Sequence, residues 1–126
     1  MDSKEIGIFG ERIAEKYLKD KGYQILDKNY SPKFITGPKT GEIDIVAKKD
    51  DIISFVEVKT LSSDEGIQPE EKVDYFKQKK IMKTAEAWFT EKKISLDNKW
   101  QIDVLAIKID LKKKTAKIRH FQNAVF

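Results

Sequence analysis

The chain has 126 residues, with 25 lysines and arginines against 21 acidic residues, and a formal net charge of +4. It has no cysteine and one histidine, which excludes disulfides, zinc–thiolate sites, iron–sulfur clusters and thiol catalysis, and leaves little material for a serine–histidine mechanism. No apolar run approaches the roughly 20 residues of a membrane span, and the amino terminus lacks a signal-peptide core, so we expect one soluble, cytoplasmic domain over residues 1–126.

The amino-terminal third of the chain predicts one helix, one strand and one loop. Ser3 can cap a helix that ends at Lys21-Gly22, because serine is a favoured cap and glycine ends helices. Apolar residues recur in it at helical spacing; they are Ile6, Phe9, Ile13, Ala14, Tyr17 and Leu18. Residues 23–27 follow a glycine and predict an edge strand, whereas residues 31–40 hold two of the three prolines and predict a long, basic loop.

The rest of the chain predicts a hairpin, a second helix and two closing strands. Residues 42–47 and 52–59 are β-rich runs joined by charged residues, which is typical of an antiparallel hairpin. A long helical pattern follows; its buried side is Val73, Phe76, Ile81, Ala85, Trp88 and Phe89. Residues 101–109 and 115–121 then predict a closing strand pair. The order αβββαββ indicates a single layered α/β domain.

The hairpin carries charged residues in a pattern that suits a metal ion. Side chains alternate across a strand, so Glu57 and Lys59 share one face. If Asp44 lies opposite Phe55, its carboxylate stands diagonal to that of Glu57 and the two can share an ion. Magnesium prefers oxygen ligands and commonly takes one or two carboxylates. A slip of one residue would move Asp44 to the opposite face, so the prediction depends on the register.

Two residues of the helices are further candidates. Glu11 lies at the margin of the first helix's apolar stripe, beside Ala14, from where it can reach over the edge of the sheet. Lys77 falls among the apolar positions of the second helical pattern, where a lysine must either extend outward or meet an acid.

The alternative interpretation of the hairpin acids is a set of solvated cross-strand pairs. The apolar residues argue against it, because we expect Ile43 and Ile45 on one face and Val46, Ile53 and Phe55 on the other. Strands that are apolar on both faces are covered on both sides, so the acids between these residues would be partly buried. A metal ion, a lysine or both would compensate their charge.

Two motifs in this hairpin resemble the active-site hairpin of the PD-(D/E)XK nuclease superfamily. They are Gly41-Glu42-Ile43-Asp44-Ile45-Val46-Ala47 and Phe55-Val56-Glu57-Val58-Lys59-Thr60. The resemblance is greatest to the YraN-type (UPF0102) family of small bacterial proteins, which is related to archaeal Holliday junction resolvases. Further pieces match in order over nearly the whole chain; they are Phe9-Gly10-Glu11, Ala14, Leu18, Gly22-Tyr23, Asn29-Tyr30, Lys77-Gln78-Lys79-Lys80, Gln101-Ile102-Asp103-Val104 and Asn123-Ala124.

The resemblance implies an α/β fold, a restriction-endonuclease-like αβββαββ core with a central mixed sheet flanked by helices. It also implies metal-dependent hydrolysis of phosphodiester bonds in DNA, including branched or structured DNA. By this likeness Asp44 and Glu57 would hold Mg²⁺ or Mn²⁺, with Glu11 as a supporting carboxylate. Lys59 would position the attacking water and stabilise the transition state, and Lys77 would assist near the scissile phosphate.

Basic residues near the hairpin are candidates for contact with nucleic acid. The loops at the open end of the hairpin emerge beside its acids, so Lys33 and Lys39 would touch a nucleic-acid backbone, as would Lys77 and Lys80 of the second helix. For the loop lysines an ordinary solvated surface is the alternative.

Other features qualify the resemblance. Ile43 stands at the proline position of the superfamily name, and Gln101 stands where arginine is common in the family. A protein that keeps the nuclease fold but only binds nucleic acid or a partner is the alternative function, and a structural adaptor is a third. Homodimers are usual among resolvases, so a homodimer is an expectation without a predicted interface. His120, Trp88 and Trp100 are expected to be packing residues.

Overall fold

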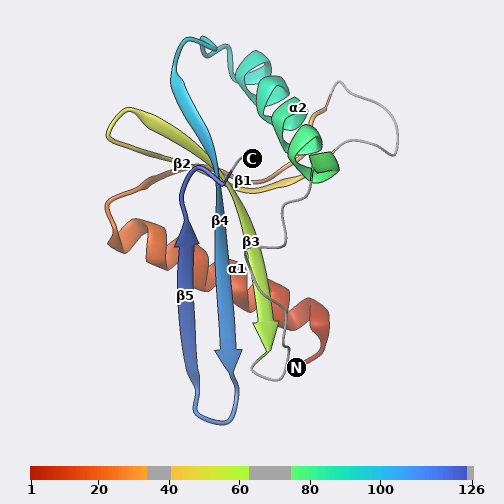
Figure 1. The fold of residues 1–126 in the computed structure, drawn as a ribbon, viewed down its shortest axis with the longest axis vertical. Coiled ribbons are helices and arrows are strands. Elements are labelled where there is room, and N and C mark those ends of the chain that lie inside the picture. The colour runs from red at the N-terminus through yellow and green to blue at the C-terminus, as the bar shows by residue number, and fades with distance from the viewer. Residues whose placement is uncertain (34–40, 63–74, 125–126) are drawn as a thin grey trace.

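The computed structural model describes residues 1–33, 41–62 and 75–124 (Figure 1). Its elements are α1 (Ser3–Asp20), β1 (Gln24–Tyr30), β2 (Ile43–Lys49), β3 (Ile52–Ser62), α2 (Tyr75–Lys92), β4 (Lys99–Asp110) and β5 (Thr115–Phe121). The predicted order αβββαββ is confirmed. Most of the predicted loop at 31–40, and Val73 of the second helical pattern, lie outside the described residues.

The strands form one mixed sheet in the order β1-β2-β3-β4-β5. All neighbours are antiparallel except β3 and β4, which are parallel. A parallel pair needs a crossover connection, and here the chain passes through α2 between the two strands. The fold is therefore α/β with a five-stranded mixed sheet and flanking helices, consistent with a restriction-endonuclease-like core. Within the described residues, neither helix combines the length and apolar character that crossing a bilayer requires.

Helix α1 covers one face of the sheet. Its buried residues contact strands β2, β3 and β4; this cluster is Ala14, Leu18, Ile45, Ala47, Val56, Leu105, Ile107 and Ile109. The helix begins with a capping box in which Asp2 accepts from the backbone N–H of Glu5, so the predicted cap at Ser3 is wrong by one residue. Asp2 has the extended backbone that an N-cap residue adopts, and Glu5 stands three residues after it.

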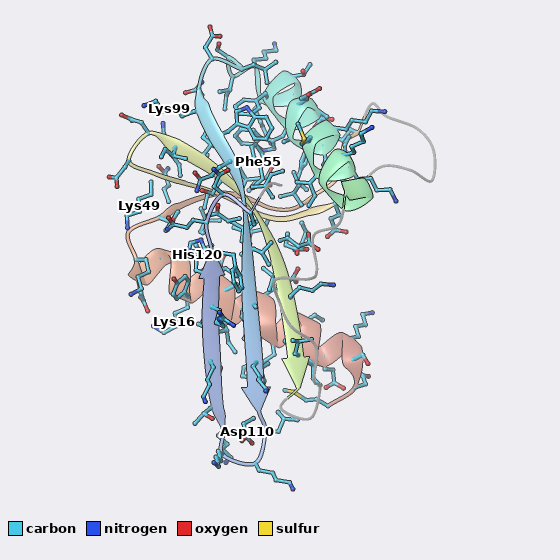
Figure 2. The ribbon with its side chains drawn as sticks, viewed as in Figure 1. Lys16, Lys49, Phe55, Lys99, Asp110 and His120 are labelled. Atoms are coloured by element: carbon cyan, nitrogen blue, oxygen red, sulfur yellow. The ribbon has the colours of Figure 1, made fainter. Side chains whose placement is uncertain are left out.

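Helix α2 lies against the opposite face. The cluster there is Tyr30, Ile43, Val46, Ile53, Phe55, Ala85, Trp88 and Phe89. Both faces of the hairpin are covered, as predicted. Ile43 belongs to this cluster and not with Ile45, contrary to strict alternation. The regular pairing of β2 with β3 ends at Ile45, so Ile43 lies beyond it. Figure 2 shows Phe55 on the side of α2, while His120 lies near α1.

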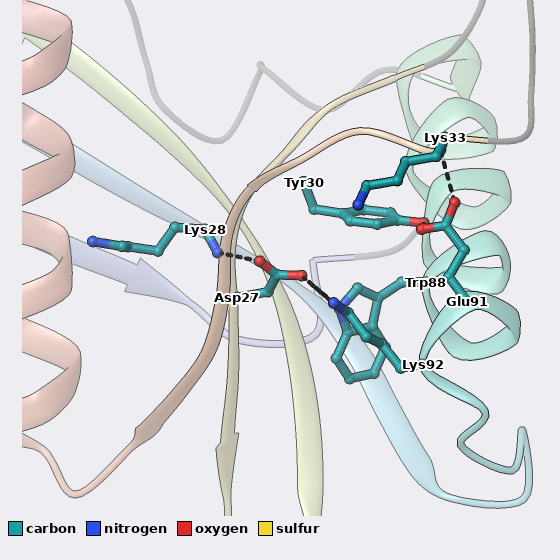
Figure 3. A network of polar contacts seen from close by, with 7 residues as sticks. All are labelled: Asp27, Lys28, Tyr30, Lys33, Trp88, Glu91 and Lys92. Carbon is teal, nitrogen blue, oxygen red and sulfur yellow. Dashed lines mark hydrogen bonds and ion pairs between the residues drawn. The ribbon is translucent and has the colours of Figure 1, made fainter.

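Polar contacts fasten α2 to β1 (Figure 3). The indole Nε1 of Trp88 donates to Asp27 Oδ2 at 3.2 Å. The Glu91 carboxylate accepts from the Tyr30 hydroxyl at 2.6 Å and from the backbone N–H of Lys33 at 2.7 Å. Burial raises the pKa of Tyr30, as does the neighbouring Glu91, so the phenol stays a donor. These contacts fix the helix relative to the edge strand that borders the hairpin.

A second polar cluster closes the α1 face near the carboxyl end of the chain. Asp103 is fully buried, and its Oδ1 accepts from Gln101 Nε2 and from the backbone N–H of Asn123, each at 2.9 Å. Its Oδ2 lies 2.8 Å from Nε2 of His120, whose other ring nitrogen is 3.2 Å from the Tyr17 hydroxyl. The histidine is thus a structural residue, and Gln101 serves the same cluster.

Candidate functional site

The hairpin register decides where Asp44 lies. The pairs run from Lys49 opposite Ile52 to Ile45 opposite Val56, so Phe55 faces Val46 and the predicted pairing of Asp44 with Phe55 is wrong. The cause is the turn, which consists of two residues where the sequence suggested four.

Asp50 and Asp51 form this turn with φ of 50° and 65°. Two successive positive φ values are the geometry of a type I′ hairpin turn, which matches the twist of the flanking strands and which aspartate tolerates. The lysines before it therefore remain in β2. The register differs from the predicted one by two residues, and the regular ladder ends at Ile45, one residue after Asp44. Asp44 nevertheless lies near Glu57, whose charge acts on its carboxyl group.

Asp44 is half-buried in an acidic environment. Its Oδ2 accepts from the backbone N–H of Val58 at 2.8 Å, which ties the start of β2 to β3 just beyond the last regular pair. Burial, with the charges of Glu57, Glu11 and Glu42, raises the pKa of Asp44 to about 7, against the lowering effect of the Val58 hydrogen bond. Ionisation of the Asp44 carboxyl group is therefore costly without a neighbouring cation.

Glu11 reaches this carboxyl group from α1. Burial and the charge of Glu42 raise the pKa of Glu11, while a hydrogen bond with Asp44 and the charge of Lys28 act against the rise. The helix lies close to the sheet at this point because Gly10 has no side chain. A Cβ there would lie 1.9 Å from Oγ1 of Thr60 on β3. Gly10 thus allows the short separation between α1 and β3 at which Glu11 can contact Asp44.

Glu57 and Lys59 lie on β3, both of intermediate exposure. The residues between and beside them confirm the predicted alternation, since Val56 and Val58 contact the α1 cluster and Phe55 belongs to the α2 cluster. Glu57 and Lys59 therefore lie on the same side of the strand as Phe55. Three of the predicted acids, Glu11, Asp44 and Glu57, come together at one end of the hairpin, and Lys59 follows Glu57 on the same side of β3.

The predicted nucleic-acid residues are described only in part. Lys33 and Lys80 are exposed. Lys80 flanks the start of β2, because a Cβ at Gly41 would lie 3.5 Å from its Cβ and 2.9 Å from Thr84 Oγ1. Lys39 lies outside the described residues, and Lys77 lies in the first turn of α2 with its side chain outside the description.

The donor set can be tested for fit to a divalent cation. Within residues 1–33, 41–62 and 75–124, no group of three or more histidine or acidic side chains is arranged to hold a metal ion by itself. Asp44 and Glu57 supply two hard oxygen donors, the number that magnesium commonly uses when waters and substrate phosphates complete its shell. Burial and then repulsion from the neighbouring acids raise the pKa of Asp44, and a bound cation would offset the cost of its ionisation.

Two residues at this site had no role in the sequence analysis, Asn29 and Glu42. Glu42 lies within the hairpin motif, and its charge acts on both Asp44 and Glu11. Asn29 lies on β1 between Lys28, which pairs with Ile45, and Tyr30, which pairs with Ile43, so the ladder sets it opposite Asp44. The sequence marks Asn29 only through the Asn29-Tyr30 motif, which matches the family but indicates no role for the side chain.

Comparison with known proteins gives matches over most of the chain. Residues 10–107 match the model of the family described as Uncharacterised protein family UPF0102, a range that includes every described residue of the acidic site. A UPF0102 protein of Alkaliphilus oremlandii is 42% identical over 122 residues, which cover 97% of this chain and 98% of that protein. A UPF0102 protein of Campylobacter jejuni is 44% identical over 105 residues, covering 83% and 85%. One of Clostridium tetani is 45% identical over 93 residues, covering 74% and 71%. The names of these relatives state no activity.

Proposed function

The chain belongs to the UPF0102 family, and we propose that it is a metal-dependent nuclease that hydrolyses phosphodiester bonds in DNA, with branched or structured DNA as its substrate. The observation that carries this proposal is the gathering of Asp44, Glu57 and Glu11 at the open end of the β2–β3 hairpin, with Lys59 on the Glu57 face. Acids that repel one another beside a lysine suit a reaction in which negative charge is bound and increases.

In this proposal Asp44 and Glu57 hold Mg²⁺ or Mn²⁺ and Glu11 supports them. The Val58 N–H donates to Oδ2 of Asp44 and so orients the carboxylate that would hold the ion. The bound metal would supply Lewis acidity toward a phosphoryl oxygen and lower the pKa of a bound water. Glu11, which lies beside Asp44 in the metal-free protein, would supply a supporting carboxylate to the same ion.

Lys59 and the basic residues of α2 act on the substrate. Lys59 would orient the attacking water and stabilise charge on the phosphorus centre, and Lys77 would assist near the scissile phosphate. Lys80 flanks the start of β2. Its ammonium would attract the backbone of the DNA strand that contains the scissile phosphate. Lys33 and Lys39 would extend this contact along the connection that precedes β2.

The test is cleavage of labelled linear, flap and four-way DNA with and without Mn²⁺. Asp44→Ala and Glu57→Ala should each lower the rate at least about 100-fold. Asp97→Ala, an exposed acid after α2, is the matched control and should cleave like the wild type. Circular dichroism and thermal unfolding check that each variant is folded. Cleavage that persists in both active-site variants would exclude this centre, and DNA binding without metal-dependent cleavage would favour the binding-only alternative.

A further inference from the structure

Asn29 has an unusual backbone conformation at the point where β1 passes the acidic site. Its φ is 50°, in the left-handed region that few residues other than glycine adopt and in which asparagine is enriched. The ladder between β1 and β2 sets this residue opposite Asp44. The side chain is exposed, so apolar packing does not account for its position.

The amide of Asn29 joins two of the acids. With its amide nitrogen turned toward α1, Asn29 donates to Glu11 Oε1 at 3.0 Å and to Glu42 Oε1 at 3.3 Å. In the reverse orientation the amide oxygen would face these acceptors, so the donating orientation is the one the surroundings support. A neutral group with two N–H donors thus lies between carboxylates that repel each other.

From these contacts we infer that Asn29 is a positioning residue, whose amide holds the Glu11 carboxylate against Asp44 and thereby strengthens divalent-metal binding at the proposed site. The inference rests on the proposed function, because it assigns to Asn29 a role in the metal centre proposed there. Groups that orient ligands in this way without touching the metal commonly affect metal affinity.

The left-handed backbone allows the amide to be tested separately from the chain geometry. Glycine adopts positive φ without strain, so Asn29→Gly removes the two hydrogen bonds and keeps the backbone. Asn123→Gly is the matched control, because Asn123 also has φ of 50° and is exposed, and its contact with Asp103 uses the backbone N–H that glycine keeps.

The experiment is a calorimetric titration of the full chain with Mn²⁺ alone. We expect Asn29→Gly to raise the dissociation constant about tenfold, the lower end of the range for such partners because the amide is exposed. Asn123→Gly should bind Mn²⁺ like the wild type. In the metal-free protein, the side-chain amide resonances of Asn29 should shift in Glu11→Gln and stay in place in Asp97→Asn.

The outcomes separate this inference from the proposed function. Equal Mn²⁺ affinity of the wild type and Asn29→Gly would overturn the role of Asn29 and leave the metal site standing. Absence of Mn²⁺ binding by the wild type would overturn the metal site, and with it the role assigned to Asn29. Weaker binding in Asn29→Gly with unchanged binding in Asn123→Gly supports both.

Discussion

Asp44 is the residue at which strand pairing, helix packing and charge meet. Its carboxyl group is held by the backbone of β3, contacted by an acid of α1 and faced by an acid of β3. The raised pKa means that the folded protein holds a proton that the unfolded chain releases near pH 4. The free-energy cost of ionising Asp44 in the folded protein therefore grows between pH 3.8 and about pH 7 and remains at higher pH.

The pH dependence of unfolding should show this effect in the metal-free protein. Stability due to this group is intact below the ordinary pKa of 3.8 and declines as the pH rises to about 7. Asp44→Asn removes the titration but keeps an oxygen that can accept from Val58. We expect it to stabilise the fold at pH 8 by about 1–2 kcal/mol, a value reduced for solvent screening, and to change little at pH 4.

Urea unfolding at both pH values, with a chelator present, measures this difference. Asp97→Asn is the control for loss of an exposed carboxylate. A gain in stability that is equal at pH 4 and pH 8 would contradict the assignment to Asp44 ionisation.

At the scale of elements, the position of α1 depends on one close approach to β3. Gly10 is buried against Thr60, and a methyl group there would meet the hydroxyl and both carbon atoms of the threonine side chain. The same helix contains Gly7, around which a Cβ would find nothing within 4 Å. The two glycines therefore have different physical reasons to be present, although both are helical.

Substitution of each glycine by alanine should give opposite effects. Gly10→Ala should destabilise the protein by about 1–3 kcal/mol, because the helix must move away from β3. Gly7→Ala should stabilise it by about 0.5–1 kcal/mol through helix propensity. Thermal and urea unfolding of both variants measure the free energies. If Gly10→Ala were as stable as Gly7→Ala, the close contact with Thr60 would not constrain the helix.

The elements were largely predictable from sequence because their signals are local. Apolar periodicity identifies both helices, and alternation identifies the hairpin, with Val56 and Val58 on one side of β3 and Phe55 on the other. The register between β2 and β3 was not predictable. It depends on the turn type at Asp50 and Asp51, and a run of charged residues does not indicate which of them take positive φ. Asn29 was missed for a related reason, since its role follows from a pairing between strands.

At the scale of the whole molecule, exposed lysines occur far from the acidic site as well as beside it. Figure 1 shows α2 at one end of the molecule and the turn between β4 and β5 at the other. Exposed lysines occur at both ends, for example Lys80 on α2 and Lys113 in the turn. Of these two residues, Lys80 is the one that lies beside the start of β2, near the acidic site. The overall charge of +4 thus gives less information about DNA binding than the location of each lysine.

Charge reversal at these two lysines should separate local contact from net charge. Lys80→Glu and Lys113→Glu change the formal charge by the same amount. We expect Lys80→Glu to weaken DNA binding about tenfold at low salt and to reduce the slope of affinity against salt, whereas Lys113→Glu has a smaller effect. Fluorescence anisotropy over a range of salt concentrations measures both. Equal losses in the two variants would point to net charge alone.

The Asp103 cluster contains a residue whose NMR signals report on the packing of the last strand. The chain holds one imidazole, and that ring contacts Tyr17 and Tyr23 as well as the carboxylate that the Asn123 backbone reaches. The ring protons of His120 therefore belong to a single residue in a proton spectrum, without isotopic labelling. Their resonances register any loosening of the last strand or of Asn123, whose backbone contacts the same carboxylate.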